Sequence, residues 1–332
     1  MNSLLFCWNV RGLGKPEKVR AVTKVLKSSK AKIAFLQESK ISQFAPNLIK
    51  RLKGRLFSEC VLSPSVGASG GIISLWDGCF FRVSSSMITD RWIGLVGQLE
   101  SCSSECLLIN LYAPNDLASR KRVFEDISEF IEKTQLPTLI GGDFNCVRNR
   151  EERLGTATNK EEMENFHEFI QRNNLLDLPL VGDSFTWFRR GSQVSASRID
   201  RMLISPIFLN WYPNATLSSL PRNLSDHKAI VLQEPAARSK NRPFKLFTYW
   251  LNYLDLAKAI QNVLETSSSA STGDALAASK KAIKKWVSNF KAVEEENLVG
   301  IEKKIEELEQ QLCWSGPDQN CTKALQKLKH SM

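Results

Sequence analysis

The feature that most restricts the fold is an apolar run, residues 137–140, that leads into two glycines, an acid and an amide. Two adjacent glycines carry no side-chain bulk, so another backbone or a ligand can approach closely. Asp143 and Asn145 are two residues apart, so in an extended segment they face one side while Phe144 faces the other. The pattern predicts a strand end with a polar face and a core anchor behind it. A turn in which both polar side chains cap the backbone is the alternative.

Other apolar runs also end in polar side chains. The runs at residues 4–10, 32–38 and 106–114 have the composition of buried strands, and shorter strands are expected near residues 197–204 and 229–232. Strand ends on one sheet edge meet at a common crevice, so we expect these side chains to lie together. The polar residues in this group are Asn9, Glu38, Tyr112, Asp143, Asn145, Asp200, Asp226 and His227.

These side chains suit the hydrolysis of a phosphodiester, which needs a divalent cation on oxygen ligands, a positioned water and donors to phosphate. Glu38 is a good ligand for a hard cation such as Mg²⁺, and Asn9 can add an amide oxygen. Asp143 is a candidate for positioning the attacking water. His227, held cationic by a carboxylate such as Asp200, would stabilise negative charge on the reacting phosphate.

Asn145 and Tyr112 complete the hypothesis, Asn145 by holding water or phosphate and Tyr112 by donating to a phosphate oxygen. Each residue type also has a plainer interpretation. An acid at a strand end, such as Glu38, is commonly a solvated rim residue, and an Asp-His pair is commonly structural. A Ser-His-Asp hydrolase would use similar residue types, but no G-x-S-x-G motif follows a strand, and no P-loop is present.

The net charge of +10 is unevenly spread along the chain. Residues 1–240 hold 32 Lys and Arg against 24 Asp and Glu, whereas residues 241–332 are nearly balanced. The basic excess therefore accompanies the polar strand ends, where a polyanion would be expected to bind. A charge that only keeps the protein soluble is the alternative.

The eight cysteines are scattered and form no C-x-x-C pair, so a zinc site is not expected. The chain begins with a strand-like run, shows no signal peptide and has no apolar stretch of membrane-spanning length. These features predict an intracellular protein, in a reducing compartment, that does not associate with a membrane.

Strands mixed with helices, and hairpin-like runs between residues 55 and 100, predict one mixed α/β or α+β domain over residues 1–234. Residues 235–243 have the composition of a linker. In residues 244–332 apolar side chains recur at helical spacing, most regularly over 276–312. This predicts a helical hairpin or a helix for self-association or partner contact, with an amphipathic helix folded back on the chain as the alternative.

Six short motifs, taken in order, resemble the exonuclease–endonuclease–phosphatase superfamily and, within it, the endonuclease domain of plant LINE-type non-LTR retrotransposons. The resemblance covers about residues 3–234. It implies an α/β fold, a four-layer αββα sandwich of two mixed β-sheets, here with a C-terminal helical extension. The motifs are Trp8-Asn9-Val10-Arg11-Gly12, Gln37-Glu38, Asn110-Leu111-Tyr112-Ala113-Pro114, Gly142-Asp143-Phe144-Asn145, Arg198-Ile199-Asp200 and Ser225-Asp226-His227.

The same resemblance implies a phosphodiesterase site at one end of the sandwich that depends on Mg²⁺, with Mn²⁺ as an alternative cation. Carried over residue by residue, it assigns Asn9, Glu38 and Asp226 to the metal, Asp143 to water activation, Asn145 and Tyr112 to phosphate contact, and His227 with Asp200 to transition-state stabilisation.

Two positions depart from the family pattern. Arg11 stands where apurinic endonucleases carry an acid near the metal, which argues against a second metal ligand and favours the retrotransposon branch. Arg201 stands where an aromatic is frequent. Residues 244–332 resemble the connector that precedes the reverse transcriptase in such elements. The Asp-Asp motif of a polymerase is absent, so we expect a truncated element or a retained endonuclease without that enzyme.

The leading hypothesis is a Mg²⁺-dependent endonuclease that nicks double-stranded DNA, which implies a nuclear location. A phosphoesterase acting on a small phosphoester or phosphoinositide is one alternative, and an inactive retrotransposon remnant that only binds is another. Trp187 is a candidate to press on a sugar or base step, or else a core aromatic. The candidate contacts to a DNA backbone are Arg148, Arg150, Arg153, Arg189, Arg190 and Arg222.

Overall fold

The chain forms two compact units, Met1–Ala237 and Arg238–Met332. The linker predicted at residues 235–243 lies outside the described residues. The computed structural model describes residues 2–43, 45–67, 69–189, 195–222, 224–234, 253–266, 273–276, 278–289, 300, 303–304 and 307–308.

The first sheet of the larger unit has seven strands and combines parallel with antiparallel pairs. In sheet order its strands are β11 (Leu180–Val181), β15 (Thr216–Ser219), β16 (Ile230–Glu234), β1 (Asn2–Asn9), β2 (Ile33–Gln37), β4 (Ser69–Trp76) and β3 (Glu59–Val66). β1 is antiparallel to β16 and parallel to β2, and Asn9 pairs with Gln37 at the end of the β1–β2 ladder. Glu38 directly follows Gln37, so two polar strand ends leave the sheet side by side.

The second sheet has six strands, and its register aligns three of the predicted site residues. In sheet order its strands are β10 (Leu176–Asp177), β14 (Asp200–Ile204), β8 (Thr138–Asp143), β7 (Glu105–Tyr112), β6 (Trp92–Leu99) and β5 (Phe81–Ile88). β8 is parallel to β7 and antiparallel to β14, so Asp143 pairs with Tyr112 on one side and with Asp200 on the other. The antiparallel pairs β3–β4 and β5–β6 confirm the hairpins predicted between residues 55 and 100.

The glycine pair at the end of β8 permits this close alignment. A Cβ atom on Gly142 would lie 1.9 Å from the carbonyl oxygen of Leu111 on β7, and one on Gly141 would lie 3.3 Å from the ring of Phe35 in the facing sheet. The close approach predicted from the two glycines is therefore made by neighbouring strands of the protein itself.

A third, smaller sheet contains three short strands, β12 (Trp187–Arg189), β13 (Ser195–Ser197) and β9 (Arg153–Leu154). The 3₁₀ helix η1 (Arg150–Glu152) leads into β9. Glu152 and Asp177 both pair with the half-buried side chain of Arg198 and the buried side chain of Arg201. These four charges attach the small sheet to β14, so Arg201, which departs from the family pattern, has a structural role here.

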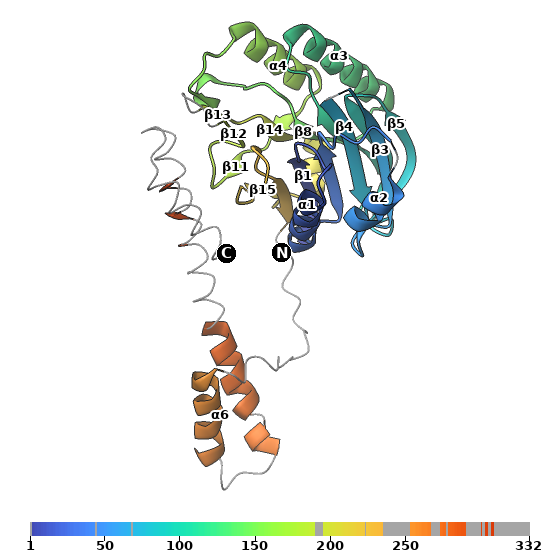
Figure 1. The fold of residues 1–332 in the computed structure, drawn as a ribbon. Helices are drawn as coiled ribbons and strands as arrows, with labels where there is room; N and C mark the ends of the chain where they lie inside the picture. The colour runs from blue at the N-terminus through green and yellow to red at the C-terminus, as the bar shows by residue number, and fades with distance from the viewer. Residues whose placement is uncertain are drawn as a thin grey trace. The chain divides into compact units, whose positions relative to one another are not determined.

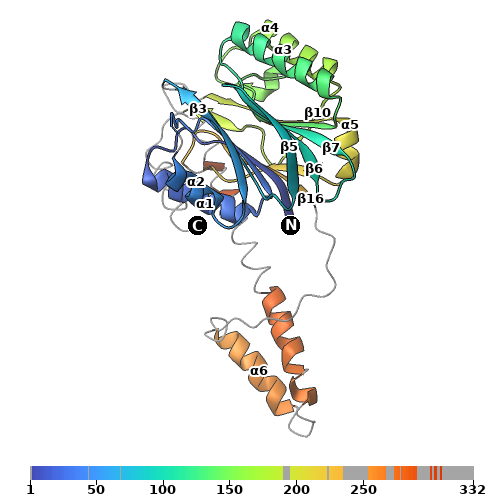
Figure 2. The same cartoon turned by 90° about the vertical axis from the view of Figure 1, so that its right-hand side faces the viewer.

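Helices cover the outer faces of the two large sheets, giving four layers (Figures 1 and 2). α1 (Pro16–Ser29) and α2 (Pro46–Lys53) pack on the first sheet, where Val19, Val22 and Leu26 of α1 are buried at helical spacing. α3 (Leu117–Thr134) and α4 (Lys160–Arg172) pack on the second sheet, and the rings of Phe124 on α3 and Phe169 on α4 stack on each other. α5 (Pro206–Trp211) follows β14, and its Phe208 joins the core between the sheets. The predicted four-layer sandwich is confirmed.

The smaller unit is helical where it is described, as predicted for the C-terminal extension. α6 (Leu254–Thr266) packs through Leu256 and Ile260 against Ile283, Trp286 and Val287, which lie in the helical residues 278–289. This part of the apolar stripe therefore has a partner within the same unit. Much of the predicted stripe at 276–312 lies outside the described residues. Among the described helices, none is both long and apolar enough to cross a lipid bilayer.

Candidate active site

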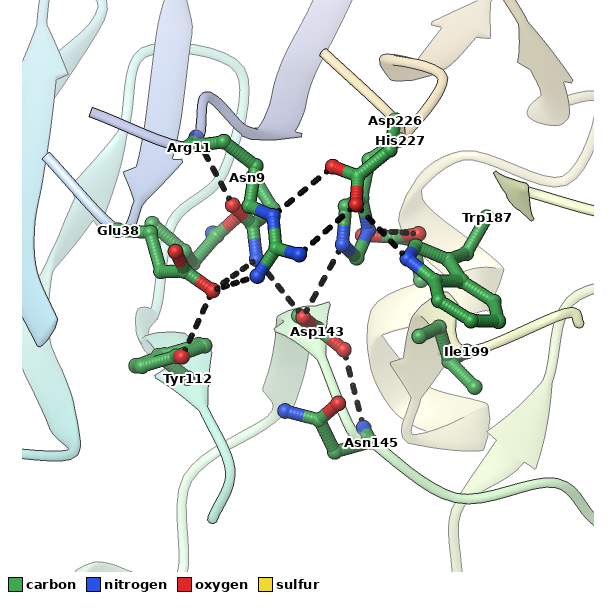
Figure 3. A network of polar contacts seen from close by, with 12 residues as sticks. Asn9, Arg11, Glu38, Tyr112, Asp143, Asn145, Trp187, Ile199, Asp226 and His227 are labelled. Atoms are coloured by element: carbon green, nitrogen blue, oxygen red, sulfur yellow. Dashed lines mark hydrogen bonds and ion pairs between the residues drawn. The ribbon is translucent and has the colours of Figure 1, made fainter. Parts of the chain in front are cut away.

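Strand ends from both large sheets meet at one end of the sandwich (Figure 3). The side-chain amide of Asn9 donates from Nδ2 to Glu38 Oε1 at 3.3 Å and to Asp143 Oδ2 at 2.9 Å. Asn9 and Glu38 come from the first sheet and Asp143 from the second, so one buried amide connects the two sheets. Three side chains that are far apart in the sequence thus form a single polar centre.

Three residues at these strand ends have left-handed backbone conformations. They are Arg11, Glu38 and Asn145, with φ values of 51°, 50° and 50°. This conformation is uncommon for residues with a Cβ atom and costs about 1–3 kcal/mol each, and such residues gather at functional sites. Here the left-handed residues turn the chain sharply as it leaves each strand, which directs their side chains towards the common centre (Figure 3).

Glu38 is buried and held by three donors on one oxygen. Its Oε1 accepts from Tyr112 Oη at 2.8 Å, from Arg11 Nη1 at 3.0 Å and from the Asn9 amide. Burial alone would raise the pKa of Glu38, but the hydrogen bond from Tyr112 and the charge of Arg11 outweigh it, so the pKa is lowered. Glu38 is therefore a carboxylate at neutral pH and is not the solvated rim residue of the alternative interpretation.

Asp226 faces Glu38 across the guanidinium of Arg11. Arg11 Nε lies 3.0 Å from Asp226 Oδ1 and Arg11 Nη2 lies 2.9 Å from Oδ2, while the indole Nε1 of Trp187 donates to Oδ2 at 3.1 Å. Burial raises the pKa of Asp226, but the charges of His227 and Arg11 lower it by more than burial raises it, so the net shift of the pKa is downward. Trp187 is half-buried and holds this carboxylate, which distinguishes it from an ordinary core aromatic.

His227 lies between two buried carboxylates. Its Nδ1 is 2.9 Å from Asp200 Oδ2, and its Nε2 is 3.8 Å from Asp143 Oδ2. Burial lowers the pKa of His227, but the charges of Asp200 and Asp143 outweigh this effect and raise the pKa to about 9. Thr186 Oγ1 accepts from the backbone amide of Asp200 at 3.0 Å and keeps that residue in place. The imidazole is therefore a cation at neutral pH.

The pKa of Asp143 shifts in the opposite direction to the pKa values of Glu38 and Asp226. Burial, together with the charge of Asp200, raises its pKa, while His227 opposes the shift. Its Oδ1 accepts from the backbone amide of Asn145 at 3.0 Å, so it also caps the turn as the plainer interpretation expected. The side chain of Asn145 donates to the carbonyl of Ala113 at 2.7 Å, which fixes the amide beside Asp143.

These groups line a cavity of about 280 Å³. Both acidic and basic side chains line its wall, so it offers positive charge for phosphate oxygens as well as carboxylates. The lining residues are Arg11, Glu38, Asn115, Asp143, Asn145, Arg153, Glu162, Trp187, Ser197, Ile199 and His227.

Residues 6–227 match the Endonuclease/Exonuclease/phosphatase family. The chain belongs to this family. The family comprises nucleases and phosphatases that hydrolyse phosphodiester bonds, so the prediction of a hydrolase acting on phosphodiesters is confirmed at the level of the endonuclease/exonuclease/phosphatase family.

Three individual proteins illustrate the similarity to this family. The transposon TX1 uncharacterized 149 kDa protein of Xenopus laevis is 26% identical over 242 residues, which cover 70% of this chain and 18% of that protein. The 3′ phosphatase NExo from Neisseria, bound to a product DNA hairpin, has a TM-score of 0.56 at 18% identity over 70% of this chain and 99% of that one. The endonuclease domain of TRAS1, a telomere-specific non-LTR retrotransposon, has a TM-score of 0.51 at 18% identity over 71% of this chain and 99% of that one.

The predicted resemblance to the family and to a retrotransposon endonuclease domain is thus confirmed. The structural similarities, at these identities, establish the fold. The chain spans about a fifth of the length of its Xenopus relative, since it covers 18% of that protein.

Some of the side chains predicted to contact DNA line the cavity, and others lie outside it. Arg153 and Trp187 line the cavity. Arg148 pairs with Asp177 at 3.9 Å and Arg222 lies over the ring of Phe188 at 5.1 Å, and neither belongs to the cavity wall. Two further residues, Arg150 and Arg189, are exposed. Arg190 lies outside the described residues.

Two groups of side chains offer ligand atoms for a metal. Asp143, Asp200 and His227 form the first group, and their ligand atoms lie within 4.8 Å of one another. The second group is Glu38, Asp226 and the amide oxygen of Asn9, a set of oxygens that fits a hard divalent cation. The guanidinium of Arg11 contacts both carboxylates of this second group.

Several cavity residues were not anticipated from the sequence. Asn115 directly follows the motif that ends at Pro114, so its position could have been extrapolated. The sequence does not indicate that Ser197 and Glu162 line the cavity. Ser197 belongs to a strand of three residues, and Glu162 is an acid on α4 that pairs with Arg120 at 3.0 Å. In the sequence Arg11 is only a departure from the family pattern, whereas in the structure its guanidinium contacts both Glu38 and Asp226.

Proposed function

We propose that the chain is a divalent-metal-dependent endonuclease that nicks double-stranded DNA. The observation that carries the proposal is the cationic His227 held between Asp200 and Asp143 at the wall of a cavity that also contains Glu38. Family membership supports hydrolysis of a phosphodiester. The basic excess of residues 1–240 supports a polyanionic substrate over a small phosphoester.

The buried charges support a separate role for each residue in the proposed reaction. Asp143, whose pKa is raised, is suited to accept a proton from the attacking water. His227 supplies a positive charge that stabilises the developing negative charge on phosphate, and Asp200 keeps the imidazole protonated and oriented. Asn145 would fix the water or a phosphate oxygen. Tyr112 was expected at the phosphate, but its hydroxyl donates to Glu38, so we assign it to orienting that carboxylate.

Glu38, Asp226 and the amide oxygen of Asn9 would hold the cation, with Mg²⁺ as the first choice and Mn²⁺ as the alternative. When bound, such a cation polarises the phosphate and neutralises charge in the transition state. The hydrogen bond from Tyr112 and the charge of Arg11 lower the pKa of Glu38 despite its burial, so the carboxylate is ionised and can bind the cation without losing a proton. This division assigns metal binding to one group of acids and proton transfer to the other.

The test is incubation of supercoiled plasmid with the full chain, in Mg²⁺ and in chelator. Glu38→Gln and His227→Ala should each reduce nicking by roughly a hundredfold or more, since each removes a charge used in the reaction. Arg20→Gln is the matched control, because Arg20 is exposed on α1 and pairs only with Glu17 of the same helix at 3.2 Å. Undiminished nicking in either site variant would refute the assignment.

The same protein preparation separates the alternatives. Release of phosphate from an inositol phosphate, without plasmid nicking, would favour the small-phosphoester hypothesis. A folded protein that binds the cation but cleaves neither substrate would favour a remnant that only binds. A DNA substrate would favour a nuclear location, and residues 244–332 would then correspond to the connector before a reverse transcriptase that the resemblance to retrotransposon endonucleases implies.

A further inference from the structure

Arg11 contacts every residue that is proposed to hold the metal. Its Nη1 lies 3.0 Å from Glu38 Oε1, and its Nη2 lies 2.9 Å from Asp226 Oδ2. Its backbone amide donates to Asn9 Oδ1 at 3.1 Å, which is the amide oxygen of the same proposed set. The left-handed conformation of Arg11 aims its side chain back across the strand ends and so makes all three contacts possible (Figure 3).

The guanidinium supplies the positive charge that the two carboxylates need. Without it, no positive charge would lie between Glu38 and Asp226, and the pKa of each is lowered in part by Arg11. Arg11 cannot lose its charge by deprotonation. A divalent cation bound to both carboxylates must therefore take the position that the guanidinium holds, and the two cations exclude each other by charge and by volume.

The side chain of Arg11 is free to give up this position. It is 43% exposed, and it lines the cavity, so the guanidinium can rotate into solvent without disturbing the core. Glu38, by contrast, is only 5% exposed and remains fixed by Tyr112 and Asn9 when Arg11 leaves. Lys40, whose Nζ lies 3.7 Å from Glu38 Oε2, adds positive charge on the other oxygen of that carboxylate.

We propose that Arg11 is a tethered competitor of the divalent cation, closing the Glu38–Asp226 pair in the metal-free protein and lowering the affinity of the site for metal. The inference rests on the proposed function, because it assumes that the cation binds at these two carboxylates. What it adds is a role for Arg11 in setting the metal affinity. An acidic side chain at position 11 would instead increase the affinity of the site for the cation. The structure thus favours a site with weak affinity for one cation over a tight site for two.

The experiment measures Mn²⁺ binding to the full chain by calorimetry with MnCl₂, in the absence of DNA. Arg11→Gln should lower the dissociation constant roughly tenfold, because the competing charge is gone while a side chain of similar length remains. Arg11→Lys keeps the positive charge, but an ammonium group cannot contact both carboxylates as a planar guanidinium does. The Mn²⁺ affinity of Arg11→Lys should therefore lie between that of the wild type and that of Arg11→Gln. Arg20→Gln removes the same charge at an exposed site and should leave the affinity unchanged.

Thermal unfolding gives a second measurement that does not depend on activity. In chelator, Arg11→Gln should unfold at a lower temperature than the wild type, and added Mn²⁺ should raise its midpoint by more than it raises that of the wild type. An unchanged or weaker affinity in Arg11→Gln, with binding still abolished by Glu38→Gln, would overturn the competitor role and leave the proposed metal site intact. Equal binding in the wild type and Glu38→Gln would instead overturn the metal site itself, and with it this inference.

Discussion

At the scale of single residues, charge pairing decides which groups of the centre carry protons. Glu38 and Asp226 are paired with Arg11 and have lowered pKa values, so they stay ionised. Asp143 is buried beside Asp200 and has a raised pKa, while His227 between them gains a proton. On the proposed function, acids of the same chemical type would thereby be separated into a metal-binding and a proton-transferring group, so that one site could perform both tasks.

The pairing of His227 with Asp200 can be measured directly by its effect on pH titration. The pKa of His227 is raised to about 9 from an ordinary value of 6.5, mainly by Asp200 once burial has been overcome. Because the folded pKa is the higher one, this pairing stabilises the fold fully below about pH 6.5, and the stabilisation is lost as the pH rises through about 9.

We therefore expect a histidine NMR signal that titrates near pH 9 in metal-free protein, and a move of that signal well towards 6.5 in Asp200→Asn. The free energy of unfolding should also fall less between pH 6.5 and 9 in this variant than in the wild type. The signal of His167, which is exposed on α4, should be the same in both proteins. A His227 signal that Asp200→Asn leaves in place would contradict the pairing as the cause.

At the scale of elements, the site depends on the alignment of β7, β8 and β14. Tyr112, Asp143 and Asp200 are neighbours because the strand register places them opposite one another. Gly142 permits this register, since its position leaves no room for a Cβ beside the backbone of Leu111. The glycine is thus required by packing within the sheet, directly before the Asp143 carboxylate of the candidate site.

A substitution at this glycine should therefore damage the fold. Gly142→Ala would place its methyl group 1.9 Å from the Leu111 carbonyl oxygen, so the strands must separate, and we expect a loss of about 3 kcal/mol or more in the free energy of unfolding. Gly14→Ala is the control, because nothing lies within 4 Å of the Cβ that it would add. Urea unfolding followed by circular dichroism measures both; equal stability of the two variants would show that the β7–β8 pairing tolerates the methyl group.

The sequence predicts the long strands and their polar ends because each is an apolar run with a polar residue at its end, as at Asn9 and Asp143. It does not predict β9 and β13, because strands of two or three residues have no measurable periodicity. Those two strands bring Arg153 and Ser197 to the cavity. The bridge made by Arg11 is equally hidden, since it depends on a left-handed turn and on acids 27 and 215 residues away.

At the scale of the whole molecule, each unit has its own apolar core. The three large hydrophobic clusters of the first unit are built from residues 4–232, and the cluster of the second unit is built from residues 256–287. The polar centre and the cavity also belong entirely to the first unit. The basic excess has the same location, because residues 1–240 hold 32 of the 45 Lys and Arg residues.

Truncation after Ala237 should therefore yield a folded protein that keeps the catalytic site. All strands of the three sheets, including β16 at Ile230–Glu234, remain in this fragment. We expect cooperative unfolding, plasmid nicking within about threefold of the full chain, and DNA binding that weakens steeply with salt because counterion release dominates such contacts. The full chain, assayed in parallel, is the control. An aggregated fragment would mean that the second unit is needed for folding. A folded fragment with full cation affinity but weak DNA binding would instead assign part of the DNA contact to residues 238–332.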